Sequence, residues 1–237
     1  NAHNEISLGG VPVYGASHLL GLFSVFNPSH YQDMTYSPTS DFNRLGGMVV
    51  MELPDTLKQK VLGDISVGLM SSQGSVGLRL GLKSHLRVSA RRSYLNLLYK
   101  PWLKINDSPF SYGFGDYNAT YMYSSGKDRL WVDLYVGNDA VALDDNSYGF
   151  GISVGWGNAI GAVHWERKSD IALQKHSVYY SGYSSKADIT QLDAKAAIDS
   201  RIASAGYKGS LEIRNFKAGA EVVYHDVIPQ SPEIEGL

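Results

Sequence analysis

The stretch that decides the fold is LWVDLYVG at residues 130–137. Aliphatic side chains occupy its even positions, and a tryptophan, an aspartate, a tyrosine and a glycine occupy its odd positions. Successive side chains of a β-strand point to opposite faces of the sheet. The alternation therefore predicts a strand with one apolar face and one mostly polar face.

The same period of two recurs along the chain from about residue 61. It is clear at 76–83, 192–202 and 207–214, and weaker at 86–94, 117–123, 150–156 and 218–224. Turn-forming residues stand at 72–74, 125–127, 144–146, 157–158 and 214–215, and a longer link covers 101–116. Residues 188–205 are rich in alanine, but their charges fall on alternate positions, which favours strand over helix. We count about eight to ten strands, so the predicted fold class is all-β and antiparallel.

Composition excludes several classes of function. The formal net charge is -2, which gives no support to a nucleic-acid partner. The chain has no cysteine, so it has no disulfide, no thiolate metal site and no cysteine nucleophile. It also has no apolar run of the length that a transmembrane helix needs, whereas a membrane-spanning β-barrel uses short alternating strands instead.

Alternation alone is compatible with two architectures. A soluble β-sandwich also places apolar side chains on one face and polar side chains on the other. Two features favour an outer-membrane barrel: tyrosines gather near the predicted strand ends, and the strands are long. In a barrel the charged face lines the lumen or contacts a plug inside it. The residues that we expect there are Arg79, Arg87, Arg91, Asp133, Asp199 and Arg201.

The N-terminal third points to a family. The runs GVPVY at 10–14 and SHLLGLFSVFNP at 17–28 resemble the later plug of TonB-dependent outer-membrane transporters of the Bacteroidota. DFNRLGGM at 41–48 stands where that family carries the end of its plug. SARRSYL at 89–95, GWGN at 155–158 and VHW at 163–165 resemble stretches of its barrel. The resemblance covers residues 9 to about 183 and is most specific in the plug.

The resemblance implies an architecture. Residues 1–60 would be the C-terminal part of a plug domain, and residues 61–237 the first part of a transmembrane antiparallel β-barrel of 22 strands when complete. The remaining strands would come from the rest of the same protein. The plug motif positions are Pro12, Tyr14, His18, Phe26, Asn27, Pro28, Arg44, Gly46 and Gly47. Arg44, Arg87 and Arg91 are candidates for ion pairs between plug and wall, and the adjacent glycines would permit a tight turn.

The function that the resemblance implies is import of a large solute across the bacterial outer membrane by energised movement of the plug. The implied partners are membrane lipid and a TonB-type energy-coupling protein, and the family also allows a surface lipoprotein or another outer-membrane subunit. Four aromatic residues are candidates for solute contact or for the interfacial girdle: Trp102, Tyr112, Phe114 and Tyr148.

Departures from the family pattern leave other functions open. Gly15 replaces the usual asparagine, Met48 replaces an arginine, and residues 34–39 lack the usual lysine. A degenerate barrel that serves as a structural subunit is therefore the second hypothesis, and a soluble β-sandwich binding module is the third. The seven histidines are scattered, and no nucleophile elbow or phosphate-binding loop occurs. We expect no enzyme activity, no metal and no cofactor.

Overall fold

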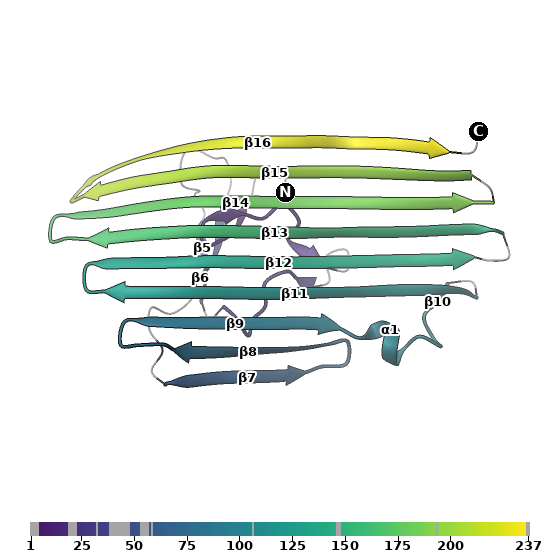
Figure 1. Ribbon diagram of the computed structural model, residues 1–237, viewed down its shortest axis with the longest axis horizontal. Coiled ribbons are helices and arrows are strands. Elements are labelled where there is room, and N and C mark those ends of the chain that lie inside the picture. The colour runs from purple at the N-terminus through teal and green to yellow at the C-terminus, as the bar shows by residue number, and fades with distance from the viewer. Residues whose placement is uncertain are drawn as a thin grey trace.

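The computed structural model describes residues 5–18, 23–31, 33–37, 48–52, 57, 59–105, 107–145, 148–192 and 194–235. Within these residues the fold is β almost throughout, with one short helix, α1 (Leu95–Leu98) (Figure 1). The prediction of an antiparallel all-β fold is confirmed. The predicted positions Arg44, Gly46 and Gly47 lie outside the described residues.

Most of the chain forms one ten-stranded sheet, in which nine strands form a meander and each is antiparallel to its neighbour. Its strands are β7 (Val61–Val67), β8 (Ser71–Arg79), β9 (Ser84–Ser93), β11 (Ser108–Ser125), β12 (Asp128–Asp145), β13 (Phe150–Lys168), β14 (Ala172–Gln191), β15 (Ala194–Ile213) and β16 (Phe216–Glu235). The short β10 (Lys104–Ile105) pairs with β11 beside this path. In the described residues, β7 and β16 are the two edges of the sheet.

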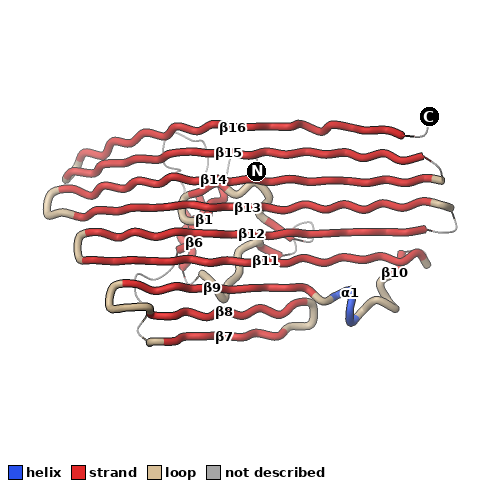
Figure 2. The backbone as a smooth tube through the Cα atoms, in the orientation of Figure 1, coloured by secondary structure: helices blue, strands red, loops and turns tan. Residues whose placement is uncertain are grey.

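The strands from β11 onward contain 18 to 20 residues each, far above the usual five or six of globular proteins. One end of the sheet carries α1 and is where β12 and β14 end and β13 and β15 begin; we call it the α1 end (Figure 2). The other carries the links at 80–83, 126–127, 169–171 and 214–215, and we call it the short-turn end. Long strands with short turns extend the apolar and polar faces over a large area.

Three local predictions need correction. Residues 188–205 are not one strand, because β14 ends at Gln191 and Leu192 turns the chain with a φ of 52°. The turn signals at 72–74 and 157–158 lie inside β8 and β13. A Cβ on Gly157 would lie 2.6 Å from the carbonyl oxygen of Gly137, so this glycine permits close approach of two strands and makes no turn.

The residues before β7 form two small sheets. One has the order β2-β1-β6-β5, built from β1 (Glu5–Leu8), β2 (Val11–Pro12), β5 (Asp33–Ser37) and β6 (Met48–Glu52), with β1 and β6 parallel. The other is the pair β3 (Ser17–His18) and β4 (Phe23–Ser24). We call the described residues 5–37 and 48–52 the N-terminal segment. It lies against one side of the large sheet (Figure 1).

The two faces of the large sheet therefore have different environments. The covered face contacts the N-terminal segment, and the open face is its reverse. A small apolar core joins the segment to the centre of the covered face, made of Leu8, Val11, Val13, Val25 and Tyr31 with Tyr135, Ile160, Ala162 and Tyr179. Around this core the covered face is polar, whereas large apolar side chains of the open face are exposed.

In the described part of the chain, no helix has both the length and the apolar character that crossing a membrane requires.

Candidate functional site

The centre of the candidate site is His18, which β3 and β4 hold against the covered face. Its Nδ1 lies 2.6 Å from Oδ2 of Asp139, and its Nε2 lies 2.7 Å from Oδ1 of Asp116. Its ring stacks on Phe114 at a centroid distance of 4.6 Å. All four side chains are buried, so these contacts are made away from bulk water.

The geometry around His18 fixes its protonation state. A neutral imidazole has one N–H donor, but here both ring nitrogens face a carboxylate, which calls for an imidazolium. Burial on its own lowers the pKa of His18, because it disfavours the charged form. Hydrogen bonds to Asp116 and Asp139, together with their negative charges, outweigh burial and leave the pKa of His18 above its ordinary value.

Arg91 completes the charge balance. Its Nε donates to Oδ2 of Asp116 at 2.7 Å, and its Nη2 donates to the carbonyl oxygen of Ser24 at 2.5 Å. The guanidinium also lies over the ring of Phe114, 5.3 Å from its centroid. Two cations thus face two carboxylates, which lowers the cost of burying all four.

Two tyrosines supply further donors to the same carboxylates. Tyr112 donates to Oδ1 of Asp139, and Tyr135 donates to Oδ1 of Asp116 at 3.0 Å. Tyr135 reaches Asp116 over Gly137, where any Cβ would collide with the phenol oxygen. Gly137 is therefore required for this contact. We call His18, Arg91, Tyr112, Asp116, Tyr135 and Asp139 the His18 cluster.

A second polar contact lies nearer the short-turn end. His30 Nε2 is 3.0 Å from Oγ1 of Thr120, which itself donates to Asp133 at 2.6 Å. Arg87 donates to the carbonyl oxygen of Ser29 at 2.6 Å. Burial, helped by the positive charge of Arg87, lowers the pKa of His30 to about 3. His30 is therefore neutral at physiological pH, unlike His18.

Contacts to the main chain extend the attachment across β13–β15. Asn158 forms a pair of hydrogen bonds with the backbone of Gly15, at 3.2 and 2.6 Å. Ser181 donates to the carbonyl oxygen of Pro12 at 2.6 Å, and Lys208 donates to that of Gly10 at 2.8 Å. Because the segment contributes only backbone atoms to these bonds, they fix its position whatever its side chains are at these residues.

The plug motif positions have different surroundings. The hydroxyl of Tyr14 is hydrogen-bonded to Ser204. Phe26 packs against the apolar core and meets Tyr31 edge-on, with ring centroids 6.3 Å apart. Asn27 is buried and accepts a hydrogen bond from the backbone of Ser29, which closes a local turn. Pro28 is exposed.

The residues predicted for the charged face divide into two groups. Arg87, Arg91 and Asp133 lie on the covered face and are buried, and Arg79 shares that face but is exposed at the end of β8. Asp199 and Arg201, in contrast, are not brought to this face. In β15 the even-numbered Ser204 points to the segment, so the odd-numbered residues point to the open face. There Arg201 pairs with Asp226 at 2.5 Å, with both side chains about half exposed.

The four aromatic candidates for solute contact also separate. Tyr112 and Phe114 are buried within the contact between the segment and the sheet. Trp102 and Tyr148 lie in connections at the α1 end, 76% and 77% exposed. Only the latter pair is accessible to a solute in this structure.

Sequence reasoning missed four polar residues of the sheet that contact the segment. Asn118 and Thr120 fall in the predicted strand 117–123, but Asp139 lies just beyond the predicted strand 130–137. Asp116 falls in the predicted link 101–116, which is wrong from Ser108 onward because β11 begins there. Within β11 and β12 these residues occupy the same alternate positions as buried neighbours such as Phe114 and Tyr135. This pattern could have identified them from the sequence. The register that aligns Asp116 with Arg91, by contrast, links residues on different strands and is not visible in local alternation.

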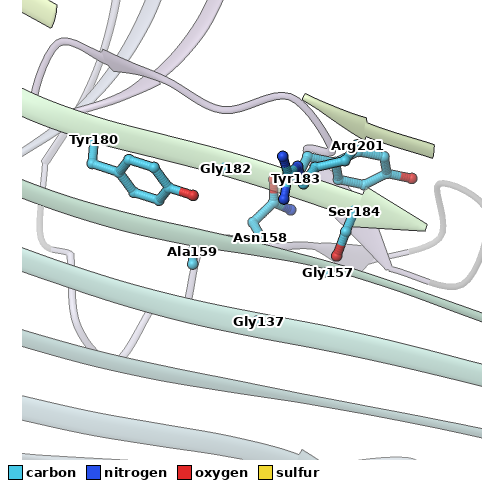
Figure 3. A pocket seen from close by; sticks show the side chains of 9 residues that line it. All are labelled: Gly137, Gly157, Asn158, Ala159, Tyr180, Gly182, Tyr183, Ser184 and Arg201. Carbon is cyan, nitrogen blue, oxygen red and sulfur yellow. The ribbon is translucent and has the colours of Figure 1, made fainter. Parts of the chain in front are cut away.

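A shallow depression of about 270 Å³ interrupts the sheet near Arg201 (Figure 3). Tyr180, Ser184 and Arg201 border it, and Gly157, Ala159 and Gly182 supply much of its floor. These six residues share the open face. Gly157, Ser184 and Arg201 pair across β13–β15, and Ala159 pairs with Gly182 in the next row across the strands. The side chain of Tyr180 lies over Gly182. The depression is therefore on the reverse side of the sheet from the His18 cluster.

The arrangement is suited to attachment of the segment by ionisable contacts. The described residues hold no group of metal-ligating side chains. The buried acids and bases of the cluster neutralise one another. No protein-family model matches the chain, and neither does any curated protein or solved structure.

Proposed function

We propose that this chain is part of a TonB-dependent outer-membrane transporter. In this proposal the large sheet belongs to the barrel wall, the N-terminal segment belongs to the plug, and energised movement of the plug admits a large solute. The observation that carries the proposal is the contrast between the two sheet faces: a continuous apolar band on the open face, and a polar face covered by a separate segment.

The apolar band follows the strand register. One cross-strand row runs Val76, Val88, Ala119, Leu134, Gly161, Tyr180, Ala205 and Tyr224, with an uncharged residue at every step. Parallel rows pass through Tyr121 and Tyr123, and a third passes through Tyr117 and stays uncharged as far as β15, before it reaches Asp226 in β16. Leu134, Val178 and Val222 in this band are 53%, 61% and 70% exposed. A contiguous apolar surface of this kind is rare on soluble monomers and indicates contact with lipid or protein.

The band has the dimensions and edges expected of a lipid-facing surface. Residues 117–123 extend about 20 Å along a strand, and the apolar band of outer-membrane barrels is about 25 Å tall. Tyr123, Trp165 and Tyr207 lie toward its short-turn end. Toward the α1 end the next row contains Arg92, Asn138, Ser184 and Arg201. Aromatic residues at one edge and polar residues at the other fit the two interfaces of a bilayer.

The covered face supports the plug assignment. Its contacts with the segment are largely hydrogen bonds and ion pairs, such as those of His18, Arg87 and Arg91. Polar contacts can be exchanged for water when a segment moves, whereas an extensive apolar interface resists separation in water. A segment held this way is suited to displacement inside a wet lumen.

The test asks whether movement of the segment is needed for uptake. The natural chain has no cysteine, so Tyr14→Cys and Ser204→Cys can be bridged by a reducible bifunctional thiol linker in living cells. Depletion of solutes from a complex medium is then compared among wild type, a deletion strain and the bridged double variant. Each single-cysteine variant is the control for the linker.

The proposal predicts that at least one solute is depleted by wild type and not by the deletion strain or the bridged variant, and that reduction of the linker restores its uptake. Equal depletion by wild type and deletion strain would overturn transport and favour the structural-subunit hypothesis. Uptake that continues with the bridge in place would overturn plug movement.

A further inference from the structure

The polarity of the two sheet faces reverses toward the α1 end. On the covered face one row contains Val141, Val154, Ala187 and Ile198, and the next contains Leu143, Ile152, Ile189 and Ala196. Tyr112 and Phe110 of β11 continue these rows. On the open face at the same level stand Ser153, Lys186, Asp188, Lys195 and Asp199. We call the two covered-face rows from β12 to β15 the apolar rows.

The reversal separates two parts of the same strands. Within the apolar band, lipid-compatible side chains are on the open face and polar ones are on the covered face. Beyond Arg201 the open face is charged, with Lys186 and Asp188 about half exposed and 3.1 Å apart. A charged outward face does not suit contact with hydrocarbon. This part of the strands therefore lies outside the hydrocarbon, and the apolar rows do not contact lipid.

Neighbouring protein in the described chain does not account for the rows either. The hydrogen bonds of the N-terminal segment reach Asp139, one row short of Val141. At this end of the described chain, α1 lies beside β11. Additional strands would bond to the edges β7 and β16, beside the sheet and not over its face. The side chains of the rows are half-buried.

We propose that the apolar rows bind an uncharged, apolar part of the imported solute, such as an aromatic or aliphatic group. This inference rests on the proposed function, which makes the covered face the lumen wall. The rows contain no ionised side chain, so they offer no counter-charge to an anionic chelate or a phosphorylated compound. Trp156, in the adjoining row beside Asp139, adds an aromatic surface where the rows meet the plug.

The experiment measures binding of N-phenyl-1-naphthylamine, a neutral aromatic dye, to the full-length protein in lipid nanodiscs. Empty nanodiscs give the partition into lipid, which is subtracted. Two substitutions disrupt the rows, Ile152→Asn and Ala187→Asp. Their matched controls alter the adjacent residue on the other face, Ser153→Asn and Lys186→Asp. Trp156→Phe tests the location, because Trp156 would transfer excitation energy to dye bound on the rows.

We expect saturable binding that weakens at least tenfold in both row variants and changes less than twofold in both controls. Trp156→Phe should keep binding but lose much of the energy transfer. No binding above empty nanodiscs, or equal loss in row variants and controls, would overturn the inference. A polypeptide that copurifies with the protein and shields cysteines placed at 152 and 187 would also overturn it, because the occupant would then be a protein.

Failure of this inference is separable from failure of the proposed function. Each variant is checked for a folded barrel by its altered electrophoretic mobility without heating and for its location in the outer membrane. If those checks succeed and the dye does not bind, only the solute class is wrong. If the wild-type protein itself is absent from the outer membrane, the proposed function is wrong, whatever the dye does.

Discussion

At the residue scale, the decisive position is His18. It joins two carboxylates that lie 98 and 121 residues away in the sequence. The sequence singled out His18 through a motif, but it could not identify these partners, because alternation assigns a side chain to a face and says nothing about which strand stands opposite. The same limit hid the roles of Asp116 and Asp139.

Removing the His18 charge should weaken attachment of the segment. His18→Asn leaves Arg91 as the only cation of the His18 cluster beside two buried carboxylates, and breaking a buried pair typically costs about 3–5 kcal/mol. We expect faster amide hydrogen exchange in residues 11–31 while the long strands keep their protection. The matched control is His176→Asn on the open face, whose histidine is hydrogen-bonded to Tyr207 at 2.7 Å. Unchanged exchange in His18→Asn would contradict the assigned role of His18.

The two histidines of the segment predict a maximum of attachment near pH 6.5. The pKa of His18 is raised in the folded state, so its stabilisation is present below about pH 6.5 and is lost as the pH rises through the raised value. The pKa of His30 is lowered to about 3, so its neutral state favours folding and stability falls as the pH drops from about 6.5 toward 3. Each proton taken up or released changes the free energy of attachment by up to about 1.4 kcal/mol per pH unit.

The measurement is the exchange rate of residues 11–31, corrected for intrinsic chemistry, at pH 4.5, 6.5 and 9. His18→Asn should flatten the alkaline side of the profile, and His30→Gln should flatten the acid side. A profile that neither substitution changes would contradict the assignment of charge to His18 and neutrality to His30.

At the element scale, the strands were predictable and their limits were not. The pattern at 130–137 lies wholly within β12, and Asp133 and Tyr135 share the covered face. The face of Asp199 was predicted wrongly because its neighbours Ala196 and Ile198 belong to the apolar rows, where the covered face is the apolar one. Alternation shows that two faces differ, but only a contact such as Tyr14 with Ser204 shows which face the N-terminal segment covers.

A charge in the apolar band should have a large effect, and the same charge beyond it should have little. Leu134→Arg places a cation at the centre of the band, which costs about 2–4 kcal/mol when that face meets the middle of a bilayer. Ser153→Arg, on the same face near the α1 end, should change stability by less than about 0.5 kcal/mol. The measurement is reversible unfolding in urea in the presence of lipid vesicles. Equal effects of the two substitutions would contradict the lipid assignment.

At the scale of the whole molecule, the proposed function requires partners for the two sheet edges. Each of β7 and β16 has a single neighbour in the described residues, and open backbone edges are not tolerated in hydrocarbon. The proposal therefore expects further strands on both. Neither periodicity nor motifs could establish closure, because it is a property of pairing between distant segments.

Closure predicts protection of the last described strand. In outer membranes that contain the intact protein, the amides of residues 216–232 should exchange as slowly as those of β13, which has neighbours on both sides. The deuterium uptake of the two strands is compared after digestion. Rapid exchange at every second amide of β16, with slow exchange in β13, would indicate a free edge and contradict closure.

The central claim is that the open face of the long strands meets lipid while the covered face does not. Single cysteines at positions 130–144 of β12 can be spin-labelled without background, because the chain has no cysteine. Accessibility to oxygen and to a water-soluble nickel complex is then measured by electron paramagnetic resonance in proteoliposomes. The account predicts that even positions from 130 to 136 favour oxygen and that 140 and 144 favour nickel. Preferential access of nickel to positions 130 to 136 would contradict it.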